Sequence, residues 1–109
     1  MTFKLNDVGE VIASRKFALV HDPSREIVVK MGRPQKIRDR NGYYCPIQIL
    51  GAGDEGIYSA VGYDAFQAIE LAFRLINLEL ELRLGDVKMS RERIGDISFA
   101  VPGGEPVGR

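Results

Sequence analysis

Few side chains in this chain of 109 residues are of the types that enzymes use for nucleophilic or acid–base chemistry. The one histidine, His21, precedes Asp22 and Pro23, a combination typical of an exposed turn rather than of a general base. The one cysteine, Cys45, precedes Pro46 in an apolar segment, which indicates a buried and unreactive thiol. No second cysteine or histidine is present to build a zinc site. We therefore predict a protein that is not an enzyme and that binds no cofactor or metal.

The segment 51–56, Gly-Ala-Gly-Asp-Glu-Gly, matches the G-x-G-x-x-G string of dinucleotide-binding proteins. That string holds a pyrophosphate where it leads from a strand into the N-terminus of a helix. Here the next segment, 57–61, has the composition of a strand, and Asp54 and Glu55 would repel phosphates. We therefore expect a hairpin loop whose glycines adopt positive φ angles.

A run of basic residues is the best candidate for binding nucleic acid or another anion. It consists of Lys30, Arg33, Lys36, Arg38 and Arg40. On a loop between two strands these side chains could contact a phosphate backbone, and Tyr43 and Tyr44 nearby could stack on single-stranded bases. The net charge of zero argues against this function, because nucleic-acid binders are usually basic overall. The same charges are also expected on a solvated loop that protects an edge strand.

The length of the chain fits a single domain that buries roughly two thirds of its unfolded surface, enough for one hydrophobic core. We expect this domain to span residues 1–101, and residues 102–109, rich in glycine and proline, to form a flexible tail. One cysteine excludes an internal disulfide. The sequence also contains no apolar run of about 18 residues, the length that a membrane-spanning helix needs. Because the N-terminus also lacks a signal-peptide core, we predict a cytoplasmic protein.

Hydrophobic alternation predicts four strands in the first part of the chain. They cover residues 8–20, 26–31, 43–50 and 57–61. The first two make a hairpin over residues 11–31, and in the third Cys45, Ile47 and Ile49 point to one face. Pro46 lacks an N–H group, so we expect an edge or a bulge near the start of the third strand.

A long helix is predicted over residues 64–84. Asp64 can accept hydrogen bonds from the first turn, Gln67 can reach back as in a capping box, and Gly85 suits a left-handed C-terminal cap. If the Gln67 side chain turns toward the sheet instead, we expect it to anchor the glycine loop 51–56. Four strands with short links and one helix predict an α+β domain, an antiparallel meander of four to five strands with the helix across one face.

The helix carries two apolar stripes where one would cover a sheet. One stripe consists of Phe66, Ile69, Phe73, Ile76 and Leu80, and we expect it to face the sheet. The other consists of Leu71, Leu75, Leu78 and Leu82. Exposed contiguous apolar surface is rare on a soluble monomer, so something should cover this second stripe.

Two alternatives could cover the second stripe. One is the C-terminal part of the same chain, whose residues 97–101 alternate like a short fifth strand or a covering segment. The other is a second copy or another protein. We predict a protein-interaction module that self-associates through the second stripe or through an edge strand. Binding of nucleic acid or an anion through the loop 30–40 is the alternative.

Two segments of the sequence resemble a group of short, uncharacterised bacterial proteins. They are 45–53, Cys-Pro-Ile-Gln-Ile-Leu-Gly-Ala-Gly, and 62–69, Gly-Tyr-Asp-Ala-Phe-Gln-Ala-Ile. A Cys-Pro strand, a glycine loop and a Gly-x-Asp-Ala-x-Gln-Ala helix start recur in that group. The resemblance, which covers residues 11–82, implies a single bacterial domain and carries over no catalytic residue.

Overall fold

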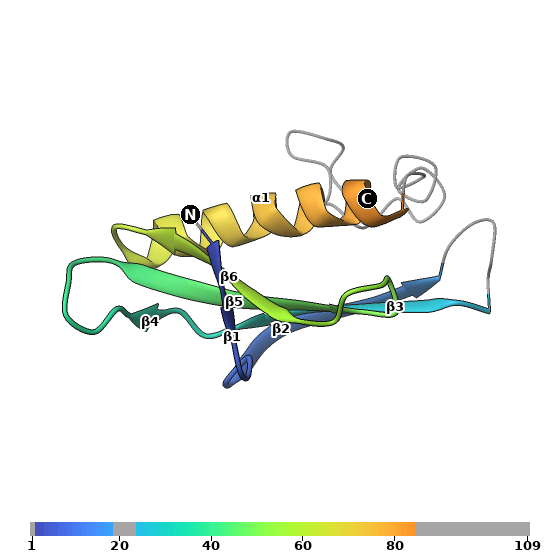
Figure 1. Ribbon diagram of the computed structural model, residues 1–109, viewed down its shortest axis with the longest axis horizontal. Coiled ribbons are helices and arrows are strands. Elements are labelled where there is room, and N and C mark those ends of the chain that lie inside the picture. The colour runs from blue at the N-terminus through green and yellow to red at the C-terminus, as the bar shows by residue number, and fades with distance from the viewer. Residues whose placement is uncertain (1, 19–23, 85–109) are drawn as a thin grey trace.

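The computed structural model describes residues 2–18 and 24–84. Within them, one antiparallel sheet forms a layer and one long helix lies across a single face of it (Figure 1). The elements are β1 (Thr2–Leu5), β2 (Val11–Ala18), β3 (Glu26–Gly32), β4 (Gln35–Lys36), β5 (Tyr43–Leu50), β6 (Ile57–Gly62) and α1 (Ala65–Leu84). The predicted α+β class, with one helix across the sheet, is confirmed.

The strand order is β1-β6-β5-β3-β2, and the short β4 pairs with the start of β5. The four predicted strands are β2, β3, β5 and β6, and each pairs antiparallel with the next, as a meander requires. The prediction missed β1, which pairs with β6 and places Thr2 opposite Ala60. β1 has four residues and no turn signal before it, so its sequence does not distinguish it from a loop. The predicted strand at 97–101 and tail at 102–109 lie outside the described residues.

The segment of residues 6–10 crosses the sheet, and we call it the crossing segment. β1 and β2 lie at opposite edges of the sheet, and this segment joins them across the face turned away from α1 (Figure 1). It passes so close to β3 that a Cβ atom on Gly32 would lie 2.0 Å from the carbonyl oxygen of Val8. The Arg33 N–H then donates a hydrogen bond of 2.8 Å to the Glu10 carbonyl. The close approach therefore requires glycine at position 32.

Pro46 lies inside the sheet, so of the two places expected for it, an edge or a bulge, the edge was wrong. The bulge fits, because residues 32–34 lie opposite only residues 45–46, a register shift of one residue at Pro46. Ser59 of β6 lies opposite Pro46 on one side of β5. On the other side, the pairing with β3 ends at Ile47 and the pairing with β4 begins at Tyr44. Pro46 falls in the gap between these two ladders, where its missing N–H group costs the sheet no hydrogen bond.

The core lies between the sheet and α1. On the sheet side, Cys45, Ile47 and Ile49 are buried together, which confirms the face predicted for the third strand. The alternating residues of β3 complete this side of the core. The helix side is made by Ala68, Ala72, Ile76 and Leu80.

The predicted orientation of α1 was wrong in part. Phe66 is 86% exposed and Phe73 is 37% exposed, although both were expected to face the sheet. Ala68 and Ala72 take the central buried positions instead, because their small side chains let the helix approach the sheet closely. The rest of the first stripe packs against the core as expected. The exposed phenylalanines and the second stripe therefore lie on opposite flanks of the helix, on either side of a buried face that includes Ile76 and Leu80.

The predicted cap at the start of α1 is confirmed. The Asp64 carboxylate accepts a hydrogen bond of 2.8 Å from the Gln67 N–H, and the Gln67 side chain accepts one of 2.8 Å from the Tyr63 N–H. Gly62 allows the chain to pass tightly from β6 into the helix, since a Cβ atom there would lie 2.6 Å from the Ala68 nitrogen. α1, the one helix in the described part of the chain, does not combine the length and apolar character that crossing a membrane takes. The predicted cap at Gly85 lies outside the described residues.

Candidate interaction surface

The four leucines predicted as an interaction stripe lie along one flank of α1 but differ in burial. Leu71 and Leu75 are half-buried and pack against the core. Leu78 is 50% exposed and Leu82 is 70% exposed, and these two lie one helical turn apart. We call Leu78 and Leu82 the leucine flank. They are the part of the predicted stripe that a partner can reach.

The opposite flank of α1 borders a cavity that the sequence did not predict. α1 packs mainly on β5 and β6, so it covers the helix-side face of β2 and β3 less closely. The cavity has a volume of about 270 Å³. It is lined by Ala13, Ser14, Arg15, Val29, Met31, Phe73 and Ile76. Its position depends on where the helix lies across the sheet, and the periodicity of the sequence does not specify that.

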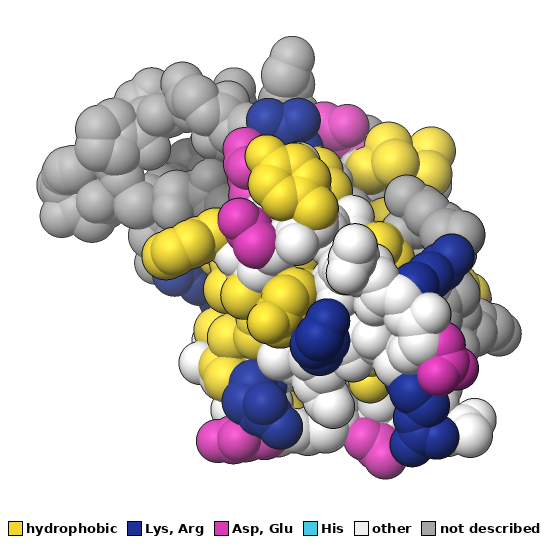
Figure 2. Space-filling model, turned by 90° about the vertical axis from the view of Figure 1, so that its left-hand side faces the viewer, with side chains coloured by type: hydrophobic (Ala, Val, Ile, Leu, Met, Phe, Trp, Pro, Cys, Tyr) yellow, Lys and Arg dark blue, Asp and Glu magenta, His cyan; other side chains and the backbone are white. Residues whose placement is uncertain are grey.

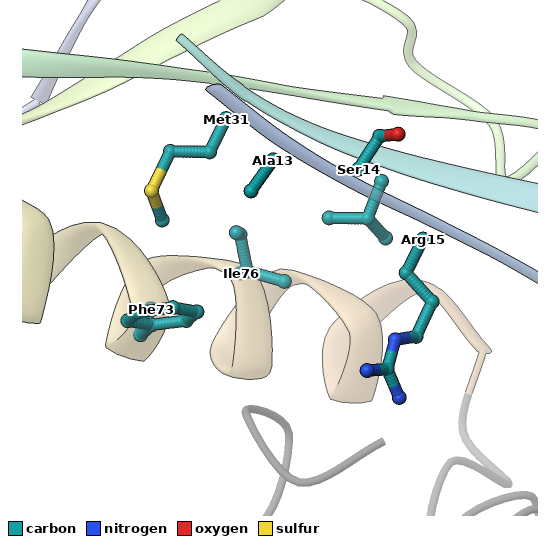
Figure 3. A pocket seen from close by; sticks show the side chains of 7 residues that line it. Ala13, Ser14, Arg15, Met31, Phe73 and Ile76 are labelled. Carbon is teal, nitrogen blue, oxygen red and sulfur yellow. The ribbon is translucent and has the colours of Figure 1, made fainter. Parts of the chain in front are cut away.

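Figure 3 shows how the side chains around this cavity are arranged. Ala13 and Met31 on the sheet and Phe73 and Ile76 on the helix point toward one another between the two layers. Arg15, two residues after Ala13, extends along one side of the cavity past the helix. The cavity is therefore apolar inside, with one guanidinium group at its margin.

β2 is an open edge of the sheet, since it pairs only with β3 among the described strands. Val11 and Ile12 at its start are exposed. The pairing register shifts between Val11 and Ala13, which marks a β-bulge, and Lys16 is exposed further along the strand. Bulges and lysines are devices by which proteins keep an edge strand from pairing with another chain. This edge is therefore protected against a second strand.

The structure does not gather the predicted basic run on one surface. Lys30 lies in β3 on the face turned away from α1, because Val29 and Met31 beside it face the core. Arg33 forms an ion pair of 3.4 Å with Glu10. The Lys36 ammonium lies 5.9 Å from the ring centre of Tyr43. The backbone alternation thus separates charges that are neighbours in the sequence.

The turn 38–41, between β4 and β5, carries the other two arginines of the run and lies at the end of the molecule that Figure 2 shows. Arg38 and Arg40 are exposed in the turn 38–41, whereas the rings of Tyr43 and Tyr44 are half-buried. On this end, acidic and basic side chains are interspersed around a hydrophobic area, and no large basic patch forms. The two predicted tyrosines therefore do not offer open faces for stacking beside a basic surface.

The glycine loop 51–56 connects β5 to β6, which confirms the predicted hairpin. The side-chain carboxylates of its two acidic residues accept hydrogen bonds from backbone N–H groups of the same loop. Glu55 accepts a hydrogen bond of 2.9 Å from the Gly51 N–H, and Asp54 accepts one of 2.8 Å from the Gly56 N–H. Gly51 and Gly53 have positive φ angles, as expected. N–H groups that a phosphate would need are therefore bound by the loop's own acids.

The anchor of this loop differs from the one expected. The Gln48 side chain, on β5, donates a hydrogen bond of 2.9 Å to the Glu55 carbonyl, while Gln67 is engaged in the helix cap. The Arg83 guanidinium, in the last turn of α1, donates to the Asp54 carbonyl. The loop is thus held from both layers of the fold.

Cys45 has the environment of a structural thiol. Its side chain is fully buried, and its Sγ donates a hydrogen bond of 3.4 Å to the Gly32 carbonyl. Burial raises the pKa of the Cys45 thiol to about 11, so the thiolate that would act as a nucleophile does not form at neutral pH. Among the described residues, no cluster of three or more His, Cys, Asp or Glu side chains is placed to hold a metal ion. His21 lies outside those residues.

Comparison with known proteins places the chain in a family. A search of the curated proteins and a search of the solved structures each found no match. A family model, however, matches residues 13–101, a range that begins within β2 and includes the rest of β2, the strands β3 to β6 and α1. A family of unknown function is consistent with the expectation of an uncharacterised family. The chain belongs to the family described as Domain of unknown function (DUF6968).

Proposed function

We propose that this protein is a non-catalytic protein-interaction module that self-associates through the leucine flank of α1. The observation that supports the proposal is the exposure of Leu78 and Leu82, at 50% and 70%, one turn apart on the surface of the helix. Two such side chains form a ridge that can pack into the groove of a second helix. The remaining exposed parts of Leu71 and Leu75 extend this ridge along the helix.

The leucine flank is a better self-association surface than the edge strand β2. Pairing two β2 strands antiparallel about a two-fold axis at Arg15 or Lys16 would place that cation opposite its own copy, and like charges opposite each other are destabilising. The bulge at residues 11–13 further interrupts the edge. The leucine flank carries neither obstacle.

The expected association is weak. Burying a leucine side chain contributes roughly 1.5–3 kcal/mol, so four partly exposed leucines in a dimer contribute roughly 4–7 kcal/mol. The loss of translational and rotational freedom on association costs roughly 4 kcal/mol or more, which offsets most of this gain. We therefore expect a reversible dimer that forms at high protein concentration.

Sedimentation equilibrium of the full chain, at concentrations up to about 1 mM, tests the proposal. A Kd of about 1 mM corresponds to a binding free energy of about 4 kcal/mol, so a dimer this weak is still detected. We expect the wild type to dimerise and the Leu78→Glu/Leu82→Glu variant to remain monomeric. Phe66→Glu is the matched control, because Phe66 is at least as exposed but lies on the opposite flank. A wild type that stays monomeric throughout, or a Phe66→Glu variant that dissociates equally, would overturn the proposal. Circular dichroism checks that each variant is folded.

A nucleic-acid or anion-binding role is the second candidate function. It is favoured by Arg38 and Arg40, which are exposed together in one turn. Filter binding to labelled single- and double-stranded oligonucleotides should then show affinity that falls as salt increases, because phosphate contacts release counterions. An absence of binding at low salt would exclude this role, and Arg38→Gln/Arg40→Gln should abolish any binding that is found.

We further propose that the protein acts in the bacterial cytoplasm. The resemblance of its strand and helix-start segments supports a bacterial origin. The single buried thiol of Cys45 is compatible with a reducing compartment. Fractionation of a bacterium that encodes the protein, followed by immunoblotting, tests the location, and recovery in the periplasm or medium would contradict it.

A further inference from the structure

The cavity between β2, β3 and α1 is formed by core residues yet opens at the edge of the sheet. Val29, Met31 and Ile76 are almost fully buried, whereas Phe73 at the margin is 37% exposed. Apolar cavities of roughly 150 Å³ stay dry and hold a molecule of the size of benzene. With about 270 Å³, this cavity has room for a longer hydrocarbon group.

The shape of the cavity follows from two features of its walls. Ala13 contributes only a methyl group at a position where β2 faces the helix, opposite Met31 of β3. α1 lies over β5 and β6 and does not close the space above β2. The volume is therefore a consequence of a small residue on the edge strand and of the placement of the helix, and a larger side chain at position 13 would occupy it.

The charge at the cavity indicates the class of ligand. Arg15 is the one charged residue among the described residues that line it, and its half-buried side chain extends past α1 (Figure 3). A guanidinium group binds carboxylates through two parallel hydrogen bonds, which are stronger away from bulk water. An apolar interior with one cation at its margin matches a molecule that has a hydrocarbon chain and one terminal carboxylate.

We propose that this cavity binds a medium-chain monocarboxylate. Its hydrocarbon chain contacts Met31, Phe73 and Ile76, and its carboxylate contacts the Arg15 guanidinium. The site lies on the flank of α1 opposite to Leu78 and Leu82, so it does not depend on self-association through the leucine flank. The proposed ligand contacts Phe73, a residue that the sequence pattern predicted to face the sheet.

Isothermal titration calorimetry of the full chain with sodium octanoate tests this proposal. We expect saturable binding with one site per chain, and at least about tenfold weaker binding of octylamine, a difference of about 1.4 kcal/mol. Octylamine has the same chain but a cationic end, so it keeps the apolar contact and reverses the charge. Amide chemical-shift changes in NMR spectra should locate the octanoate at Ala13, Met31 and Phe73.

Three variants separate the parts of the site. Arg15→Gln should weaken octanoate binding at least about tenfold. It should not make octylamine bind as tightly as octanoate binds to the wild type. Ala13→Leu should abolish the binding of octanoate by filling the cavity. Lys16→Gln is the matched control, because it removes a charge from the next residue of the strand, which points to the other face. Absent heat, equal affinity for octylamine, or an equal loss in Lys16→Gln would each overturn the proposal.

Discussion

Gly32 and the carbonyl oxygen of Val8 are in such close contact that a Cβ atom on Gly32 would lie 2.0 Å from that oxygen. The nearby Pro46 ring, 2.9 Å from the same position, closes the other side. We predict that Gly32→Ala destabilises the fold by roughly 3 kcal/mol, the upper range for overpacking, because backbone rather than a flexible side chain must move. Urea unfolding followed by circular dichroism measures the change.

Gly53→Ala is the comparison for that substitution. Gly53 has a φ angle of +90°, but a Cβ atom there would meet nothing within 4 Å. Its substitution should cost roughly 1–2 kcal/mol, from backbone strain alone. If Gly32→Ala is no more destabilising than Gly53→Ala, the crossing segment is not held against β3 as the structure indicates.

The cap of α1 gives a second prediction. Asp64→Ala removes the acceptor for the Gln67 N–H and should lower the free energy of unfolding by about 1 kcal/mol. Asp64→Asn keeps an oxygen acceptor and should retain most of the stability. Thermal melts of the two variants measure the difference, and an equal loss in both would mean that the hydrogen bond is not the source of the effect.

Two ion pairs on α1 have the same spacing but different surroundings. Glu70 and Arg74 are exposed, whereas Arg83 is mostly buried beside Glu79 and also donates to the carbonyl of the glycine loop. We expect Arg74→Ala to change stability by less than about 0.5 kcal/mol, as is usual for exposed helix pairs. Arg83→Ala should cost roughly 1.5–3 kcal/mol, because it removes charge-assisted hydrogen bonds. Equal effects in chemical denaturation would contradict the role assigned to Arg83.

Cys45 should make stability depend on alkaline pH. Burial raises the pKa of its thiol from 9.0 to about 11, so the unfolded chain loses the thiol proton at lower pH than the folded one. The stability contributed by the protonated thiol is fully present below pH 9 and is lost as the pH rises toward 11. The free energy of unfolding of the wild type should therefore fall more steeply than that of Cys45→Ala over this range. A difference between the two proteins that does not change with pH would refute this.

The strands and the start of the helix could be predicted because their signals are local. The alternation of Cys45, Ile47 and Ile49 gave β5 with the same bounds as the structure, 43–50. Asp64 and Gln67 made the helix start recognisable from two side chains three residues apart. Each of these features depends on residues that are close in the sequence, and no distant contact changes them.

The features that could not be predicted depend on distant contacts. The core face of α1 is centred on Ala68 and Ala72, whose small size is decisive only once a sheet is placed against them. A count of large apolar residues favours Phe66 and Phe73 instead, and for this reason the first stripe was assigned to the wrong side in part. The candidate surface shares this limit: the stripe that contains Leu78 and Leu82 follows from helical spacing alone, but the cavity arises from elements that are separate in the sequence.

The crossing segment joins β1 to β2, and the pairing of β1 with β6 implies an order in which the strands assemble. Among the described strands β1 comes first and the strand it pairs with, β6, comes last, so the contacts of β1 are among the least local in the sheet. Contacts between residues far apart in the chain form slowly, because a long loop must close before they can. During synthesis from the N-terminus, β1 must therefore wait until the meander from β2 to β6 exists. Of the strands that the structure describes, the one synthesised first is therefore the last to form its pairing.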